Sequence, residues 1–334
     1  MIDIFGTLGP SCSDESTLEK MFAEGMTGIR INLSHIALCD CIDEIQMIHS
    51  AAEKCQVSPK ILIDMQGPEL RVGQIGSPIE LNEGDTVTFV KDEIDLSGKD
   101  RINVPKEVLA HLAPGMDVLL DDGKILVTVE SVHETYAEAK VRRGGILTSR
   151  KSIALKDAKV DLPAMTNEDV ENIKTAKDLG IYGVMQPFVR SREDLLEVRR
   201  ILDENGCSDF KIFAKIENKD GMKNISAFMD VCDEIIIARG DLGNSMPLWE
   251  LPGAQKHIAK QCRAVGKPFM VVTQMLSSME HSKVPTRAEV SDIYNAILDG
   301  ASSVMVTGET AVGEYPVEVI RYLKKTAEEA LKSI

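Results

Sequence analysis

The stretch KIFAKIENKDG, residues 211–221, combines a predicted buried strand with charged residues at its end. Its first six residues are mostly apolar, and a short continuous apolar run is typical of a parallel strand that is covered on both faces. Lys215 and Glu217 stand two positions apart, so their side chains should project from the same face of the strand. Residues 219–230 then carry a helical pattern. The stretch therefore predicts one strand-and-helix unit whose strand ends in a charged pair.

The same pattern recurs along the chain. Eight short apolar runs have the length of buried parallel strands: IDIF (2–5), GIRIN (28–32), KILID (60–64), YGVMQ (182–186), KIFAKI (211–216), EIIIA (234–238), PFMVVT (268–273) and SVMVT (303–307). Most precede an amphipathic segment, and several of these segments have Ser, Asp or Asn near the start and Gly just past the end, as helix caps require. Eight such units predict an α/β protein with a (β/α)8 TIM barrel, and a doubly wound open sheet is the alternative.

An interruption follows the third predicted strand. Three segments alternate polar and apolar residues as exposed strands do, namely 79–90, 116–131 and 135–145, with DDGK and RGG as turn signals. We expect an all-β lid domain, residues 71–161, inserted into a barrel that is formed by residues 1–70 and 162–334. Loops that follow barrel strands open at the C-terminal face, so this insertion is expected to lie over the active-site mouth.

Composition and charge limit the expected partners. The formal net charge of -15 argues against nucleic acid, whose phosphates are normally bound by a basic face. No apolar run approaches the roughly 18 residues of a membrane span, so no membrane partner is expected. The first residues, MIDIFGTLGP, show no secretory or transit signal, and the seven scattered cysteines suit reduced thiols. These features predict a cytoplasmic protein.

Polar residues gather at the predicted C-terminal ends of the strands, where a barrel places its catalytic groups. In strand order they are Thr7; Arg30, Asn32, Ser34 and His35; Asp64; Gln186; Lys215 and Glu217; Arg239 and Asp241; Thr273; and Thr307 and Glu309. A merely structural barrel has little reason to collect these groups at one level, so we expect one active site there. For Lys215 and Glu217 alone, the alternative is a solvent-facing ion pair that contributes under about 1 kcal/mol.

Two carboxylates near a lysine and two arginines suit Mg²⁺ held between the protein and a phosphorylated substrate. Glu217 and Asp241 are the candidate ligands, although ARGDLG (238–243) can also form a tight turn with a capping Asp. Arg30 has a planar fork of donors that matches two phosphate oxygens, and a surface ion pair is its alternative.

A second cluster of oxygen donors comprises Asn32, Ser34 and Asp64. These donors suit a weakly held monovalent cation better than a transition metal, and the alternative is a hydrogen-bonded network that supports neighbouring loops. In the insertion, the basic run VRRGGILTSRKS (141–152) is either a solvated face or a part of the lid that brings Arg150 and Lys151 onto phosphates.

The order of motifs along almost the whole chain resembles the pyruvate kinase family. The matching segments are FGTLGPS (5–11), GIRINLSH (28–35), LIDMQGPELRVG (62–73), LLDDGK (119–124), VDLPAMT (160–166), KIENKDG (215–221), IIARGDLG (236–243), VVTQMLSSM (271–279), PTRAEVSD (285–292) and GETAVGEYP (308–316). The resemblance implies a phosphotransferase of glycolysis that converts phosphoenolpyruvate and ADP to pyruvate and ATP, with Mg²⁺ (or Mn²⁺) and K⁺ as cofactors. It covers the family's barrel and lid but not its C-terminal domain, so we expect neither sugar-phosphate activation nor the usual assembly, while a homo-oligomer through barrel helices stays open.

The resemblance also implies catalytic and substrate-binding roles for the residues of these motifs. Lys215 would stabilise the moving phosphoryl group and the enolate oxygen, and Arg30 would hold the phosphoryl group. The backbone of Gly240 and Asp241 would bind the substrate carboxylate. The side that protonates enolpyruvate and contacts the substrate would consist of Thr273, Thr307 and Glu309.

Cofactor and nucleotide contacts follow from the same resemblance. The Mg²⁺ ligands would be Glu217 and Asp241. The K⁺ shell would consist of Asn32, Ser34, Asp64 and the carbonyl of Met65, with Glu69 where potassium-dependent members carry a glutamate. The nucleotide contacts would be Asn32, His35, Arg71 and Lys151.

Several positions depart from the family's pattern. Gln66 replaces a lysine, Ile36 a glycine, Pro187 a serine and Ser245 a glutamate, and SIALKD (152–157) differs from the usual segment after the basic run. These changes affect the expected nucleotide grip and lid hinge and leave the metal and phosphoryl residues in place. Two other functions therefore stay open, a metal-dependent lyase or aldolase acting on pyruvate enolate and a non-catalytic paralogue that binds phosphoenolpyruvate or nucleotide.

Overall fold

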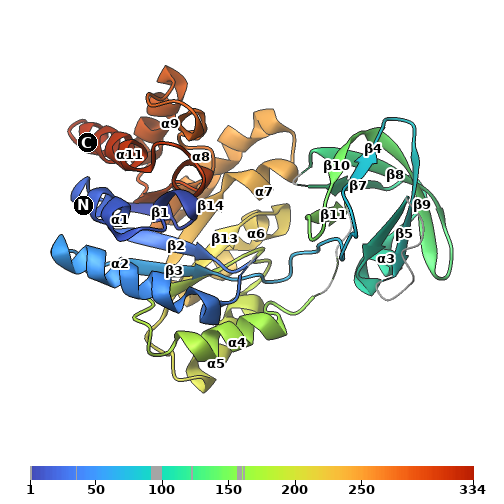
Figure 1. The fold of residues 1–334 in the computed structure, drawn as a ribbon, viewed down its shortest axis with the longest axis horizontal. Coiled ribbons are helices and arrows are strands. Elements are labelled where there is room, and N and C mark those ends of the chain that lie inside the picture. The colour runs from blue at the N-terminus through green and yellow to red at the C-terminus, as the bar shows by residue number, and fades with distance from the viewer. Residues whose placement is uncertain (1, 35, 92–99, 122, 156–159, 161) are drawn as a thin grey trace. The chain divides into compact units, whose positions relative to one another are not determined.

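The computed structural model describes residues 2–34, 36–91, 100–121, 123–155, 160 and 162–334 of the chain. The chain divides into two compact units (Figure 1). One comprises Met1–Gly67 and Pro163–Ile334, and the other comprises Pro68–Leu162. Among the described residues, no helix is long and apolar enough to cross a bilayer.

The first unit is a closed barrel of parallel strands, as predicted, and not an open sheet. In order around the barrel the strands are β1 (Asp3–Thr7), β2 (Gly28–Asn32), β3 (Lys60–Asp64), β12 (Gly183–Gln186), β13 (Lys211–Ile216), β14 (Glu234–Ala238), β15 (Phe269–Val272) and β16 (Ser303–Met305). Every one of them coincides with a predicted apolar run to within two residues at each end. The sequence pattern therefore predicted both the number of strands and their positions.

Helices follow the strands and cover the outside of the barrel (Figure 1). They are α1 (Glu15–Ala23), α2 (Ile42–Lys54), α4 (Asn167–Ala176), α5 (Arg192–Glu204), α6 (Lys219–Asn224), α7 (Arg239–Asn244), α8 (Leu251–Ala264), α9 (Arg287–Leu298), α10 (Gly308–Ala311) and α11 (Pro316–Leu331). Capping boxes at Thr166, Ser191 and Thr286 fix the starts of α4, α5 and α9.

Two helices differ from the expectation. The segment ARGDLG forms helix α7 and not a tight turn. Helix α6 ends at Asn224, and the chain continues in short 3₁₀ turns where a longer helix was predicted. Ile225 and Phe228 are both fully buried there, and their spacing of three suits a 3₁₀ turn, in which residues three apart lie above one another.

Side chains alternate between the barrel interior and the layer beneath the helices. In β14, Ile236 packs with the interior cluster, whereas Ile235 and Ile237 pack in the outer layer. Leu62 of β3 and Phe213 of β13 also belong to the interior cluster. Because residues two apart share a face, the residues that follow these at the C-terminal ends of the strands point into the barrel mouth.

The second unit is built mainly on strands, as predicted for the insertion after the third barrel strand. A six-stranded sheet has the order β11 (Ile153–Leu155), β7 (Asp117–Leu120), β8 (Ile125–Val132), β9 (Tyr136–Arg143), β5 (Thr86–Lys91) and β6 (Arg101–Val104), and a two-stranded sheet pairs β10 (Gly145–Leu147) with β4 (Ile79–Leu81). The DDGK signal joins the antiparallel strands β7 and β8.

One short helix, α3 (Lys106–His111), is present in this unit in addition to the strands. Pro105 precedes it, and Val108 and Leu112 are buried in the core of the unit. Their spacing of four is a helical signal that the alternating strands around it obscured. Whether the unit covers the active-site mouth stays a prediction.

Candidate active site

An ion-pair chain joins β2, β3 and β13 at the C-terminal end of the barrel. Asp64 Oδ2 accepts a hydrogen bond from Arg30 Nε at 2.7 Å and lies 2.6 Å from Arg30 Nη2. Lys215 Nζ lies 3.2 Å from both Asp64 oxygens and 3.0 Å from Glu217 Oε1. The side chains of Lys215 and Glu217 are 13% and 1% exposed, which excludes the solvent-facing pair considered for them.

Strand geometry explains why these residues meet. Arg30 and Asp64 point inward because Ile29, Ile31 and Ile63 pack in the outer layer. Lys215 follows the interior residue Phe213 by two positions and so stands above it on the same face. Three strands thereby deliver one cation or carboxylate each to a common level, as the sequence predicted.

The electrostatics of this chain keep Lys215 and Asp64 charged. Burial opposes charge on Asp64, but the cations of Lys215 and Arg30 and their hydrogen bonds outweigh it and hold its pKa below the ordinary value. Burial likewise opposes charge on Lys215, yet the carboxylates of Asp64 and Glu217 outweigh it and raise the Lys215 pKa. These carboxylates therefore favour the charged form of the buried Lys215.

Glu217 behaves differently from Asp64. Burial is the main cause that raises the pKa of Glu217 to about 7. The negative charges of Asp241 and Asp64 also raise it, and the positive charge of Lys215 opposes the shift. Its Oε2 accepts the backbone N–H of Phe188 at 2.8 Å. Burial and the neighbouring carboxylates thus disfavour the charged form of Glu217.

A divalent cation beside Glu217 would favour the ionised form of this carboxylate. Glu217 and Asp241 supply oxygen donors, and Mg²⁺ commonly uses one or two protein carboxylates with waters and phosphate oxygens. In the part of the chain that the structure describes, no group of three or more His, Cys, Asp or Glu residues is arranged to hold a metal. That Glu217 and Asp241 hold Mg²⁺ stays a prediction.

The oxygen donors of the second cluster also lie together. Asn32 and Asp64 are register partners on β2 and β3. Asn32 Oδ1 accepts the N–H of Ser34 at 3.2 Å, so part of the hydrogen-bonded network considered as the alternative is present. Asp64 additionally carries the ion pairs with Arg30 and Lys215, which the sequence did not indicate.

Arg239 is directed to the protein itself and not presented as a second phosphate ligand. Its Nε and Nη2 donate to the carbonyl of Thr273 at 3.1 and 2.7 Å, and its Nη1 lies 2.6 Å from Asp292 Oδ2. Of the two arginines noted near the carboxylates, Arg239 thus pairs with the protein, and Arg30 stays the predicted phosphoryl ligand.

The loop after β15 has an unusual backbone. Thr273 and Gln274 have φ values of 79° and 55°, in the left-handed region. Such a conformation in a non-glycine residue costs about 1–3 kcal/mol and is concentrated at functional sites. Thr273, predicted to belong to the proton-delivery side, thus lies in a loop whose shape the surrounding contacts must maintain.

Glu309 anchors the other end of this loop. It is 1% exposed, its Oε1 accepts the N–H of Leu276 at 3.1 Å, and its Oε2 accepts the N–H of Thr307 at 2.7 Å. The carboxylate thus ties the loop after β15 to the loop after β16. Thr7 also contacts the protein itself, because its hydroxyl donates a hydrogen bond to the carbonyl of Val306 at 2.9 Å.

The remaining candidates lie in the inserted unit or outside the described residues. Arg71 Nη2 lies 2.6 Å from Glu69 and its Nη1 donates to the carbonyl of Arg150 at 2.8 Å. Lys151 Nζ lies 2.8 Å from Asp121. His35 lies outside the described residues.

Sequence reasoning missed a buried carboxylate at the base of the insertion. Asp169 of α4 accepts the N–H groups of Gln66 at 2.7 Å and Gly67 at 2.9 Å, besides capping its own helix at Thr166. The capping box Thr-x-x-Asp was visible in the sequence, but its second role was not. The family departure Gln66 lies at this junction, where its side chain donates to the carbonyl of Leu33.

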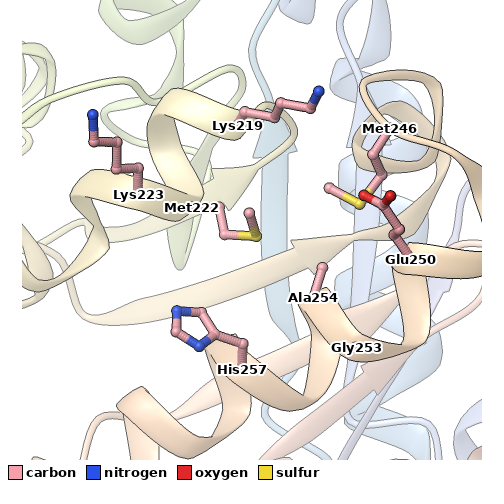
Figure 2. Close-up of a pocket in the computed structure, with 8 residues that line it drawn as sticks. All are labelled: Lys219, Met222, Lys223, Met246, Glu250, Gly253, Ala254 and His257. Atoms are coloured by element: carbon pink, nitrogen blue, oxygen red, sulfur yellow. The ribbon is translucent and has the colours of Figure 1, made fainter.

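A separate pocket of about 530 Å³ lies between α6 and α8 (Figure 2). Met222 and Met246 face each other across it, and the amino groups of Lys219 and Lys223 point away from its centre. None of its described lining residues belongs to the ion-pair chain. The candidate active site therefore rests on the ion-pair chain at the barrel mouth and not on this pocket.

Comparisons with known proteins agree with the barrel and its insertion. The family model described as "Pyruvate kinase, barrel domain" matches residues 1–320. A pyruvate kinase of Clostridium acetobutylicum is 37% identical over 330 residues, which cover 98% of this chain and 70% of that protein. A pyruvate kinase of Chlamydia trachomatis serovar D is 38% identical over 331 residues, 99% of this chain and 68% of that protein. One from Thermococcus litoralis is 38% identical over 328 residues, 97% and 68% respectively. Because the similarity spans nearly the whole chain and includes the strands that bring Arg30, Asp64 and Lys215 together, the chain belongs to the pyruvate kinase family.

Proposed function

We propose that this chain transfers the phosphoryl group of phosphoenolpyruvate to ADP and so forms pyruvate and ATP, the last step of glycolysis, with Mg²⁺ (or Mn²⁺) and K⁺ as cofactors. The observation that carries the proposal is the buried cation Lys215, held 3.2 Å from Asp64 and 3.0 Å from Glu217, with Arg30 on the same Asp64. Membership of the pyruvate kinase family supports the choice of substrates.

The reaction requires stabilisation of negative charge at two places. The bond between phosphorus and the enol oxygen breaks, its electron pair stays on that oxygen, and a new bond forms from phosphorus to a terminal phosphate oxygen of ADP. Preorganised cations are the main source of catalysis in such transfers. Lys215 serves the enolate oxygen and the moving phosphoryl group, and Arg30 holds the phosphoryl oxygens with its planar fork of donors.

Glu217 and Asp241 are the proposed Mg²⁺ ligands. When bound, the metal ion supplies positive charge to the phosphoryl oxygens. Its charge would also favour the ionised form of Glu217, whose pKa of about 7 reflects burial among carboxylates. Gly240 and Asp241 lie in the first turn of α7, and we assign their backbone to the substrate carboxylate, as the family resemblance implies.

The K⁺ ligands are proposed to be Asn32, Ser34, Asp64 and the carbonyl of Met65. Their oxygens suit a weakly held monovalent cation, and the register pairing of Asn32 with Asp64 supports the grouping. The nucleotide contacts stay as predicted from the resemblance: Asn32, His35, Arg71 and Lys151.

After phosphoryl transfer, the enolate takes up a proton at its methylene carbon and becomes pyruvate. Thr273 and Thr307 are the proposed hydroxyl groups on this side of the substrate. Glu309 holds the N–H of Thr307 and of Leu276, so its part is to fix both loops.

A coupled assay tests the proposal. Pyruvate formation from phosphoenolpyruvate is measured with and without ADP, Mg²⁺ and K⁺, and we expect turnover that needs ADP and Mg²⁺ and is lost in Lys215→Ala. The matched control is Lys60→Ala, because Lys60 also stands on a barrel strand and pairs with a carboxylate, Asp3, at 2.6 Å. ADP-independent cleavage of an aldol substrate to pyruvate would support a lyase or aldolase, and ligand binding without turnover a non-catalytic paralogue.

A further inference from the structure

The four-residue segment from Thr273 to Leu276, which follows β15, adopts a backbone that its sequence does not favour. Thr273 has a φ of 79° and Gln274 a φ of 55°, and neither is glycine. For a β-branched residue such as threonine this is an outlier, because the branched side chain crowds the backbone. Such a conformation persists only where the surroundings fix it from several directions.

Arg239 supplies most of the polar contacts that fix this segment. Its guanidinium donates twice to the carbonyl of Thr273, at 3.1 and 2.7 Å, and once to the carbonyl of Gln274 at 3.3 Å. Its remaining nitrogen lies 2.6 Å from Asp292 of α9, and the Arg239 side chain is only 11% exposed. A planar fork can reach two carbonyls and a carboxylate at once, whereas a lysine ammonium cannot match this geometry.

The next residue, Gly240, leaves little room for a side chain beside Thr273. A Cβ atom at Gly240 would lie 3.1 Å from Cγ2 of Thr273, closer than is usual for such atoms. Arg239 thus contacts the backbone carbonyl of Thr273, and a side chain at position 240 would crowd the methyl group of Thr273. Asp241 follows directly, so the position of Thr273 is linked to the first turn of α7.

We infer that Arg239, held by Asp292, is a positioning residue that sets Thr273 against the first turn of α7 and thereby controls the protonation of the enolate. This inference rests on the proposed kinase function. Arg239 acts through the backbone of Thr273 and has no assigned contact with substrate. Glu309 completes the arrangement by holding the N–H of Leu276 at the far end of the segment.

Kinetics of three variants test the inference. Arg239→Gln removes the charge and the fork, and a displacement of reacting groups by about 1 Å can lower a rate about 100-fold. We expect pyruvate formation at saturating substrates to fall at least about tenfold in this variant, with the KM for phosphoenolpyruvate changed less than about threefold. Arg239→Lys should recover only part of the rate, since it restores charge without the fork. Asp292→Asn should cause a smaller loss.

The matched control is Arg192→Gln. Arg192 also donates to a backbone carbonyl, that of Ala227 at 3.1 Å, and pairs with a carboxylate, Asp230, on the outside of the barrel. It lies in α5 and has no part in the proposed site. Its removal should leave the kinetic constants within about twofold of the unaltered chain.

A second readout separates positioning from a general loss of structure. An enzyme that delivers a proton to the enolate also removes one from the methyl group of pyruvate in the reverse direction. Exchange of the pyruvate methyl protons with deuterated water, with Mg²⁺ present, should therefore fall more in Arg239→Gln than ATP formation does. Equal losses of proton exchange and ATP formation would overturn the inference.

Amide hydrogen exchange makes the test independent of turnover. Peptides that include Gln274 and Leu276 should exchange their amide hydrogens faster in Arg239→Gln and Asp292→Asn. Their exchange rate should be unchanged in Arg192→Gln. If the unaltered chain makes no pyruvate, the proposed function fails, while faster exchange in this segment still supports the positioning contact. Unchanged amide exchange together with unchanged kinetics overturns the inference whatever the function. Should Arg239→Gln not fold, Arg239→Lys and Asp292→Asn give the same comparison.

Discussion

Lys215 Nζ lies 3.2 Å from both carboxylate oxygens of Asp64, although the two residues stand 151 positions apart in the chain. The barrel brings them together because β3 and β13 both place inward-facing residues at their C-terminal ends. Asp64 is also the counter-ion of Arg30, so one carboxylate orients the two cations that are proposed to act on the phosphoryl group. This shared counter-ion is the central feature of the site.

Removing this counter-ion should destabilise the protein. In Asp64→Asn the side chain keeps its size but loses its charge, so Arg30 loses its carboxylate partner and Lys215 keeps only Glu217 in a buried place. Breaking one partner of a buried ion pair typically costs about 3–5 kcal/mol. The free energy of unfolding, measured by urea titration at pH 7, should fall by that order.

A matched comparison for Asp64→Asn is available at the other end of the barrel. Asp3 pairs with Lys60 at 2.6 Å, but the two side chains are 28% and 34% exposed. Asp3→Asn should therefore change the free energy of unfolding by no more than about 1 kcal/mol. Similar losses of unfolding free energy in Asp64→Asn and Asp3→Asn would show that burial does not increase the contribution of the Asp64 ion pairs to stability.

Glu217→Gln should weaken the use of Mg²⁺. The substitution keeps the shape and the acceptor for the N–H of Phe188 but removes one of the two proposed carboxylate ligands. We expect the Mg²⁺ concentration for half-maximal activity to rise at least about tenfold, and calorimetric Mg²⁺ binding to weaken in parallel. Glu204→Gln, at an exposed pair with Arg200, is the control and should change neither. Unaltered Mg²⁺ dependence in Glu217→Gln would remove this residue from the metal site.

Much of this architecture was accessible from the sequence because its signals are local. Each barrel strand appears in the sequence as a short apolar run, and capping residues such as Ser191 indicate helix starts. Knowledge that parallel strands align their C-terminal ends then sufficed to place Lys215 and Glu217 at a common mouth.

Long-range contacts account for what the sequence did not reveal. Nothing near Arg239 in the chain indicates that its guanidinium will meet the backbone of Thr273, and nothing near Asp169 indicates Gln66 as a partner. Both contacts depend on the angles at which loops leave different strands, and these angles are set by packing and not by periodicity. The left-handed backbone of Thr273 was hidden for the same reason, since threonine has no local preference for it.

Glu234 should give the protein a characteristic pH dependence at the N-terminal end of the barrel. Burial raises its pKa above the ordinary value, although the hydroxyl groups of Ser303 and Ser302 donate to it and oppose the shift. The folded state therefore binds the proton of Glu234 more tightly than the unfolded state does. This contribution to stability is fully present below the ordinary pKa of glutamate and is lost as pH rises through the raised pKa.

The variant Glu234→Gln cannot ionise, so it should gain stability relative to the unaltered chain between pH 5 and pH 8. The gain corresponds to about 1.4 kcal/mol for each unit by which the pKa is raised. Urea titrations at pH 5, 6, 7 and 8 measure the difference in unfolding free energy. Glu289→Gln is the control, since hydrogen bonds from Ser278 and Thr286 outweigh burial and hold the Glu289 pKa below its ordinary value. The difference in unfolding free energy between this variant and the unaltered chain should stay constant from pH 5 to pH 8. A flat difference for Glu234→Gln as well would contradict the prediction.

Gly67→Ala should destabilise the junction between the barrel and the insertion. Gly67 has a φ of 58°, in the left-handed region, and a Cβ atom there would lie 2.4 Å from Cγ of Pro187, a ring atom with little freedom to move. Its N–H is fixed by Asp169 at 2.9 Å, so the backbone cannot relax without losing a buried hydrogen bond. The backbone strain alone costs about 1–2 kcal/mol, and the contact with Pro187 adds to it.

Gly76→Ala is the control, because no heavy atom lies within 4 Å of a Cβ built there, and it should change the free energy of unfolding by less than about 0.5 kcal/mol. If urea titration gives the two variants the same stability, the close approach of Gly67 to Pro187 does not constrain the residue at this position.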